Sequence, residues 1–175
     1  MAVKITTRNL SKGMEVEWAN GLNCYSFAAK CDNPGGGGLI SCLPGARGGR
    51  AVTQGTITPI TLHNACVADG FIDMSGGVIS SDSKFKNPPV CEPTNYLIAV
   101  FYDTRRSFHF ARQLADGSKN KKKWVHKPSA AQSAHNMHNG WYLLDDLSNA
   151  EWGNFEFVSY LKAPNAGIAV NKGTF

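Results

Sequence analysis

Residues 96–102 form a near-continuous apolar run, YLIAVFY, in the second half of the chain. A short run without polar alternation predicts a strand that is buried on both faces of a sheet. Three further strands are predicted, at 107–113, 121–127 and 155–162. Polar turns separate the first three strands, and strands joined by such turns pair in antiparallel fashion. The second half of the chain therefore predicts an antiparallel sheet.

The first half of the chain predicts two helices. Residues 23–31 contain no Gly or Pro and are flanked by helix breakers on both sides, which favours a short helix. Residues 58–70 predict a second helix, with Thr58 as the N-cap, Pro59 as the first helical residue and Gly70 just after the last. Helices followed by an antiparallel sheet indicate the α+β class, with N-terminal helices packed on a C-terminal sheet.

The composition is that of an ordinary globular protein. At 175 residues, with 42% hydrophobic and 18% charged residues, the chain suits a single domain over 1–175. It contains no apolar run long enough for a transmembrane helix, and its first residues contain no apolar core of a signal peptide. We therefore expect a protein that is cytoplasmic as synthesised, and that would need another route for release or for packaging in a particle. The net charge of +5 favours anionic partners.

The cysteine pattern favours thiols over disulfides. An odd number of cysteines without a CxxC pair fits a reduced compartment, or one free reactive thiol, better than a disulfide framework or a structural zinc site. The five cysteines are Cys24, Cys31, Cys42, Cys66 and Cys91.

Cys24 is the candidate nucleophile because it lies at or near the start of the first predicted helix. Unpaired backbone N–H groups and the helix dipole at such a position lower the pKa of a thiol and favour thiolate. The alternative is that Cys24 is a small buried hydrophobic residue, which is the commoner role of a cysteine. Asn23 and Trp18 are candidates for the oxyanion or cleft region beside it, and Trp18 could equally belong to the core.

His109 is the candidate general base because it interrupts an apolar strand. It shares one face of that strand with Ala111 and Gln113, while the neighbouring residues share the other face. If Gln113 opposes Lys122 on the following strand, His109 directly opposes His126, with Cβ atoms about 5 Å apart. His126 would then orient the base. A carboxylate is the more usual orienting group, which makes Asp145 and Asp146 the competing candidates. His109 could also be a single satisfied polar residue on a strand.

A helix that opens with Asn-Cys-Tyr, followed by a histidine-bearing hairpin, resembles the papain-like cysteine peptidases, and most closely their NlpC-type and CHAP-type branch. The segments 22–29 and 107–128 are also similar to "NCY.YA" and "HFYR…DG.W.HKPG" motifs of bacterial and phage proteins. The resemblance implies a papain-like fold, with Cys24 as nucleophile, His109 as general base and His126 as third member. It implies hydrolysis of a peptide, isopeptide or amide bond, as in peptidoglycan, without a cofactor.

Two other functions can be weighed against this one. A structural or binding protein, such as a component of a phage particle with protein partners in a larger assembly, could keep a hydrolase-like fold without turnover. The basic run at 119–123 predicts a solvated hairpin tip rather than a nucleic-acid site. His135 and His138 could share a metal ion if they lay on a helix, but no third ligand is indicated and a loop is predicted there, so we expect no metal site.

Overall fold

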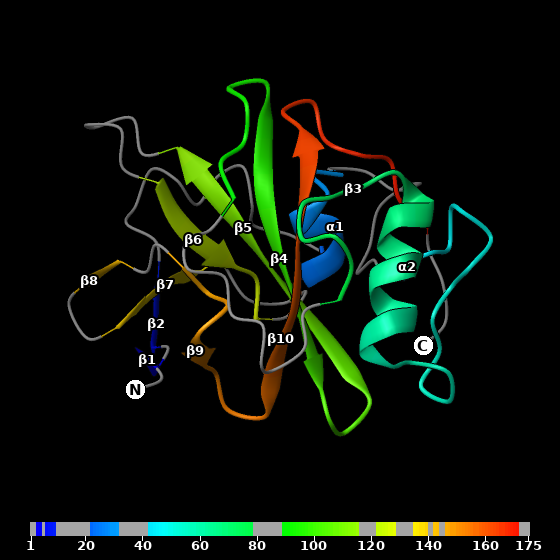
Figure 1. The fold of residues 1–175 in the computed structure, drawn as a ribbon, viewed down its shortest axis with the longest axis horizontal. Helices are drawn as coiled ribbons and strands as arrows, with labels where there is room; N and C mark the ends of the chain where they lie inside the picture. Colours follow the sequence, from blue (N-terminus) through cyan, green and yellow to red (C-terminus); the bar gives the residue numbers. More distant parts are fainter. Residues whose placement is uncertain are drawn as a thin grey trace.

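The computed structural model describes residues 3–4, 6–9, 22–31, 42–78, 89–115, 122–128, 135–139, 142–143 and 146–171. In this part of the chain, two helices pack on an antiparallel sheet, so the protein has a mixed α+β fold (Figure 1). Neither helix is long and apolar enough to cross a membrane within the described ranges.

Four long strands form the centre of the main sheet, as the sequence predicts. They are β4 (Asn95–Asp103), β5 (Ser107–Ala115), β6 (Lys122–His126) and β10 (Phe155–Pro164). The C-terminal strand β10 pairs with β4 along its whole length, so the last long strand lies inside the sheet. The apolar run at 96–102 is buried on both faces because strands lie on both sides of β4 and side chains cover the sheet from above and below.

Further strands, none longer than β6, extend the sheet on both sides of these four. The order is β2-β7-β6-β5-β4-β10-β3, with β8 paired to β7, and every pair in this sheet is antiparallel. The strands outside the central four are β2 (Thr6–Asn9), β7 (His135–Asn139), β8 (Tyr142–Leu143) and β3 (Ile72–Asp73). A separate parallel pair consists of β1 (Val3–Lys4) and β9 (Ala150–Glu151). The sheet thus takes one strand from the N-terminal region, β2, at residues where the sequence predicted none.

The second helix, α2 (Pro59–Asp69), confirms its predicted ends. Thr58 is the N-cap, and its side chain accepts a hydrogen bond from the backbone N–H of Thr61, whose own hydroxyl accepts one from the backbone N–H of Thr58. This reciprocal pair satisfies two donors at the helix start. Gly70 ends the helix with φ +110°, a left-handed conformation that favours glycine.

The first helix, α1 (Cys24–Ala28), is shorter than the predicted segment 23–31. Asn23 is its N-cap and accepts a hydrogen bond from the backbone N–H of Ser26 at 2.9 Å. The helix stops after one turn because Lys30 takes a left-handed φ of +52°. The backbone N–H of Cys31 then donates to the carbonyl of Ser26, which closes the helix end.

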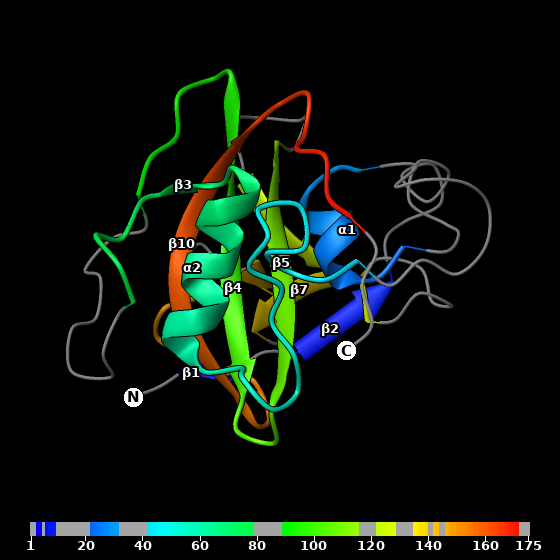
Figure 2. The same cartoon turned by 90° about the vertical axis from the view of Figure 1, so that its right-hand side faces the viewer.

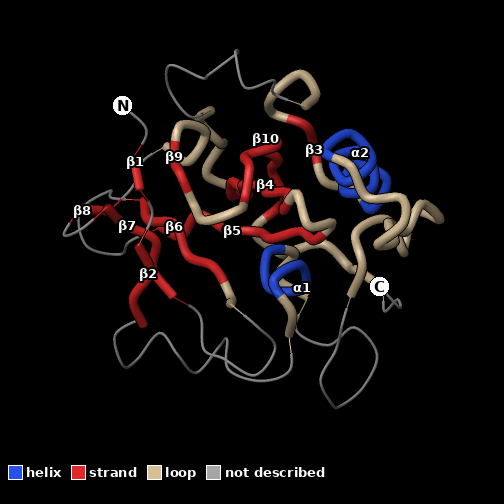
Figure 3. Tube along the Cα trace, turned by 90° about the horizontal axis from the view of Figure 1, so that it is seen from below, coloured by secondary structure: helices blue, strands red, loops and turns tan. Residues whose placement is uncertain are grey.

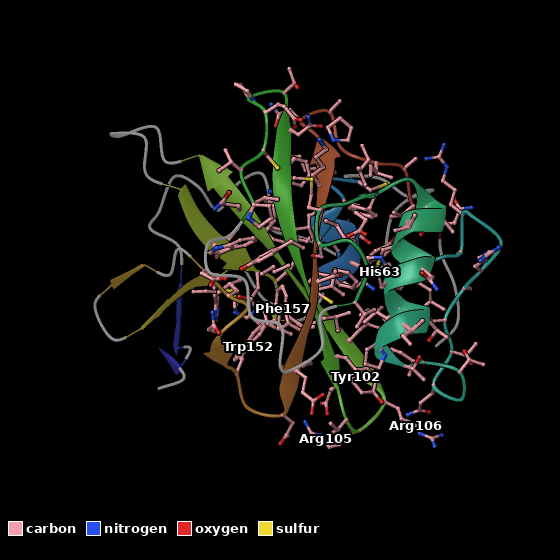
Figure 4. All side chains as sticks on the ribbon, viewed as in Figure 1. His63, Tyr102, Arg105, Arg106, Trp152 and Phe157 are labelled. Carbon is pink, nitrogen blue, oxygen red and sulfur yellow. The ribbon has the colours of Figure 1, made fainter. Side chains whose placement is uncertain are left out.

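Each face of the sheet carries its own core. Both helices pack on one face, which we call the helix side: α2 lies alongside β4 and β10 in Figure 2, and α1 lies against β5 in Figure 3. The helix-side core includes Cys24, Tyr25, Leu62, Cys66, Ile98, Val100 and Phe110. The opposite face, which we call the far side, includes Leu97, Ala99, Phe101, Ala111, Trp124 and Tyr160. In Figure 4, Trp152 and Phe157 lie over the sheet away from α2.

Candidate active site

Cys24 is the first residue of α1, but its side chain is only 8% exposed. Backbone N–H groups of Cys24, Tyr25 and Phe110 face the sulfur, and each lowers the pKa of the thiol. Burial in the helix-side core is the larger effect and raises that pKa to about 12. The sequence predicted a lowered pKa, and this direction is wrong. One helical turn supplies few amides, while the surrounding core removes the water that would solvate a thiolate.

His109 lies on β5, and its ring shares a hydrogen bond with His126 on β6. The two ring nitrogens, Nε2 of His109 and Nδ1 of His126, are 2.9 Å apart. Trp152 packs edge-on against both rings, with ring centres 4.8 Å away in each case, and Phe155 packs against His109. Burial lowers the pKa of His109 to about 3. Burial, followed by the neighbouring imidazoles of His109 and His135, lowers the pKa of His126 to about 2.

The register of the β5–β6 hairpin differs from the predicted one. Gln113 opposes Trp124 rather than Lys122, and Ala111 opposes His126. His109 and His126 are therefore diagonal neighbours rather than directly opposed. They still meet because a slip of two residues keeps every side chain on its own face, and diagonal positions remain within reach of long side chains.

The hydrogen bond leaves the other nitrogen of His109, Nδ1, for a second partner. A neutral imidazole carries one donor and one acceptor nitrogen, so the proton position on one ring dictates the role of the next. If Nε2 of His109 donates to Nδ1 of His126, then Nδ1 of His109 is unprotonated and can act as a base. This is the protonation state that a thiol hydrolase requires.

Cys24 and the histidine pair lie on opposite faces of β5. The sulfur packs on the helix side, where the backbone N–H of Phe110 faces it, whereas His109 projects to the far side together with Ala111. His109 and Phe110 are consecutive in β5, and consecutive residues of a strand point to opposite faces. The ring of His109 therefore lies on the far side, while the side chain of Phe110 lies on the helix side with Cys24. Among the described residues no hydrogen bond joins Cys24 to His109. The structure thus brings His109 and His126 together, and places Cys24 next to their strand.

The other predicted site residues either lie outside the described residues or make hydrogen bonds elsewhere in the fold. Trp18 and Asp145 lie outside the described residues. The side chain of Asn23 accepts hydrogen bonds from the backbone N–H and hydroxyl of Ser26 and donates to the carbonyl of Cys42 at 2.7 Å, so it anchors the start of α1. Asp146 accepts hydrogen bonds from the hydroxyls of Tyr160 and Ser148.

Sequence reasoning missed two residues of the site, His135 and Trp152. His135 lies on β7 directly opposite His126, with ring centres 5.7 Å apart, and the predicted loop at this segment is wrong because it forms a strand. Trp152 comes from the turn before β10 and carried no local signal of its position. In the described ranges no group of three His, Cys, Asp or Glu side chains is arranged to hold a metal ion. All five cysteines are free thiols.

The chain was compared with families and proteins of known kind. No family model, no curated protein sequence and no solved structure matches it significantly.

Proposed function

We propose that the protein is a papain-like cysteine hydrolase that cleaves a peptide, isopeptide or amide bond, with Cys24 as nucleophile, His109 as general base and His126 as the orienting residue. The observation that carries the proposal is the 2.9 Å hydrogen bond between Nε2 of His109 and Nδ1 of His126. The base of a thiol hydrolase uses one ring nitrogen for the thiol and the other for an orienting group. Nε2 of His109 is engaged by His126 in the way an orienting group would engage it, which leaves Nδ1 for the thiol in the proposal, and α1 contacts the strand of His109 directly.

The surroundings of the sulfur support the same proposal. The backbone N–H groups of Cys24, Tyr25 and Phe110 that face it are donors of the kind that stabilise a thiolate, or the oxyanion of a tetrahedral intermediate. In the proposed reaction, Nδ1 of His109 takes the thiol proton and the sulfur attacks the carbonyl carbon. The C–N bond then breaks, the leaving amine takes the proton from His109, and water, deprotonated by His109, hydrolyses the thioester. A peptide cross-link of a cell wall would be one such substrate.

The reaction requires that the sulfur of Cys24 and Nδ1 of His109 come into contact. In the structure the thiol is neutral, with a pKa of about 12, and the imidazole is neutral, with a pKa of about 3. Burial causes both shifts, but in different cores: Cys24 lies in the helix-side core, and His109 lies under Trp152 and Phe155 on the far side. The proposal therefore includes a rearrangement of β5, sampled already in the free protein, that opens the helix-side core at Cys24 and brings the ring of His109 to that side.

Alkylation of the native protein with iodoacetamide at neutral pH, followed by peptide mapping, tests this proposal. Cys31, which is partly exposed, and Cys66, which is buried, serve as internal references. We expect Cys24 to react at least tenfold faster than Cys31, and His109→Ala to remove this advantage. Cys24→Ala should remain folded and lose hydrolysis. The proposal is wrong if Cys24 reacts no faster than Cys66, or if His109→Ala leaves its rate unchanged.

A second candidate function is that of a non-catalytic structural or binding protein, such as a component of a phage particle. The observation that favours it is the burial of Cys24, because a thiol with a pKa of about 12 is inert. The net charge of +5 would suit an anionic partner surface. The same alkylation experiment separates the two functions, since an inert Cys24 is expected of the binding protein alone, whereas Cys24→Ala stays folded in both cases.

A further inference from the structure

Three histidines form a row across three adjacent strands on the far side of the sheet. His109 lies on β5, His126 on β6 and His135 on β7. His126 and His135 are directly opposed in the antiparallel register, so their side chains share a face. The two rings are nearly perpendicular, with an interplanar angle of 83° and centres 5.7 Å apart. The hydrogen-bonded pair of the proposed active site thus has a third imidazole beside it.

Among the residues that the structure describes, the second and third histidines each bury a ring nitrogen that has no hydrogen-bond partner. These atoms are Nε2 of His126 and Nδ1 of His135. A buried polar atom left in this state costs about 1–3 kcal/mol, and native proteins satisfy nearly all such atoms. The two atoms belong to facing rings, and the imidazole of His135 is close enough to lower the pKa of His126. A donor on one ring and an acceptor on the other would satisfy both atoms at once.

The proton positions along the row depend on one another. If Nε2 of His109 donates to Nδ1 of His126, then His126 must carry its own proton on Nε2. That N–H is the buried atom that needs an acceptor. In the opposite arrangement, Nδ1 of His126 donates to Nε2 of His109, which forces the proton of His109 onto Nδ1. His109 would then have no basic nitrogen to offer a thiol.

We infer that His135 is a positioning residue: its Nδ1 accepts a hydrogen bond from Nε2–H of His126, directly or through one water molecule, and so fixes the tautomers of His126 and His109 that leave Nδ1 of His109 basic. This inference rests on the proposed function for its consequence in catalysis. The proton arrangement itself is a property of the folded protein and can be measured without a substrate. Trp152 supports the arrangement because its ring packs edge-on against both His109 and His126.

The test uses a matched pair of variants at one position. His135→Asn places an acceptor oxygen near the site of Nδ1, whereas His135→Phe keeps a ring of similar shape without an acceptor. The readout is the tautomer of each histidine, obtained from long-range proton–nitrogen NMR correlations of ¹⁵N-histidine-labelled protein at pH 7, with His126→Gln and His109→Gln for assignment. Burial lowers the pKa of all three histidines below 6.5, so the rings are neutral at this pH.

We expect the wild type to carry its protons on Nε2 of both His109 and His126. In His135→Phe, we expect both rings to shift toward the Nδ1–H tautomer, and in His135→Asn we expect the wild-type pattern. A wild-type His126 with its proton on Nδ1 would overturn the inference, and so would an unchanged pattern in His135→Phe. If His135→Phe does not fold, His135→Ala replaces it in the same comparison.

Cys24 alkylation separates a failure of this inference from a failure of the proposed function. If the inference holds, the alkylation rate of Cys24 falls at least tenfold in His135→Phe and recovers in His135→Asn. A reactive Cys24 with tautomers that do not respond to His135→Phe overturns the role of His135 alone. An inert Cys24 in the wild type, with tautomers that do respond, overturns the hydrolase and leaves His135 as the residue that orients the histidine row.

Discussion

Replacing Asp69 should clearly destabilise the protein, because this residue holds the helix that carries Cys24 in place. Asp69 is the last residue of α2, and its side chain is 2% exposed. Its carboxylate accepts hydrogen bonds from the hydroxyl of Tyr25 at 2.6 Å and from the backbone N–H groups of Gly45 and Gly48 at 2.8 Å each. Tyr25 follows Cys24 in α1, so one buried carboxylate links α1 and the turn around Gly45 to α2.

Asp69→Ala removes the acceptor and leaves three donors without a partner. A hydrogen bond to a charged group contributes about 1.5–3 kcal/mol, and removing one member of a buried charged network costs about 3–5 kcal/mol in total. We therefore expect the free energy of unfolding to fall by about 4 kcal/mol. For a protein of this size, a loss of that magnitude lowers the Tm by about 10 °C.

Urea denaturation followed by far-UV circular dichroism measures the loss, and Tyr25→Phe is the matched control because it removes one donor and keeps the ring. Tyr25→Phe should cost about 1 kcal/mol in the wild type and close to nothing in the Asp69→Ala background, because its partner is then absent. A loss of less than about 1 kcal/mol in Asp69→Ala would refute the reasoning. Equal costs of Tyr25→Phe in both backgrounds would show that the two side chains do not interact.

Two further predictions concern pH and helix capping. Burial lowers the pKa of His109 to about 3 and of His126 to about 2, so below pH 6.5 the unfolded chain binds more protons than the folded one. The free energy of unfolding should therefore fall as the pH drops from 7 to 5. The expected loss at pH 5 is about 2 kcal/mol for each histidine, and urea titrations at the two pH values measure it. His126→Gln should reduce the loss, and stability that is flat over this range would contradict the burial of the pair. Thr58→Ala should lower the free energy of unfolding by about 1 kcal/mol, whereas Thr58→Ser should keep most of it, and equal stabilities of the two variants would contradict the capping box.

The predictable part of the fold depends on local signals. The ends of α2 follow from Thr58, Pro59 and Gly70, because capping and a left-handed glycine act within a few residues. The central strands follow from their apolar residues and the turns between them. The end of α1 was not predictable in the same way, because Lys30 takes a left-handed conformation that usually requires Gly or Asn, so its residue type gives no signal of the helix end.

The sequence predicted that His109 and His126 meet on one face of the sheet, and they do, but the strand register that was considered for them is off by two residues. Several residues separate the end of β5 at Ala115 from the start of β6 at Lys122, so the sequence leaves the register open by steps of two residues. Such a step changes which residues are directly opposed, but it keeps His109 and His126 on one face. The period of the strand was therefore sufficient to place the two rings together, and the contact of the two rings did not depend on the turn.

Strand period, capping residues and the buried run at 96–102 are properties of the sequence itself, and they determined the α+β class, the ends of α2 and the shared face of His109 and His126. The tertiary structure alone decided the pKa of Cys24 and the approach of His135 and Trp152 to the pair. A helix start favours thiolate through its nearest amides, but the cost of removing water depends on every element that covers the sulfur. Those elements come from distant parts of the chain, so local sequence could not reveal that burial would prevail.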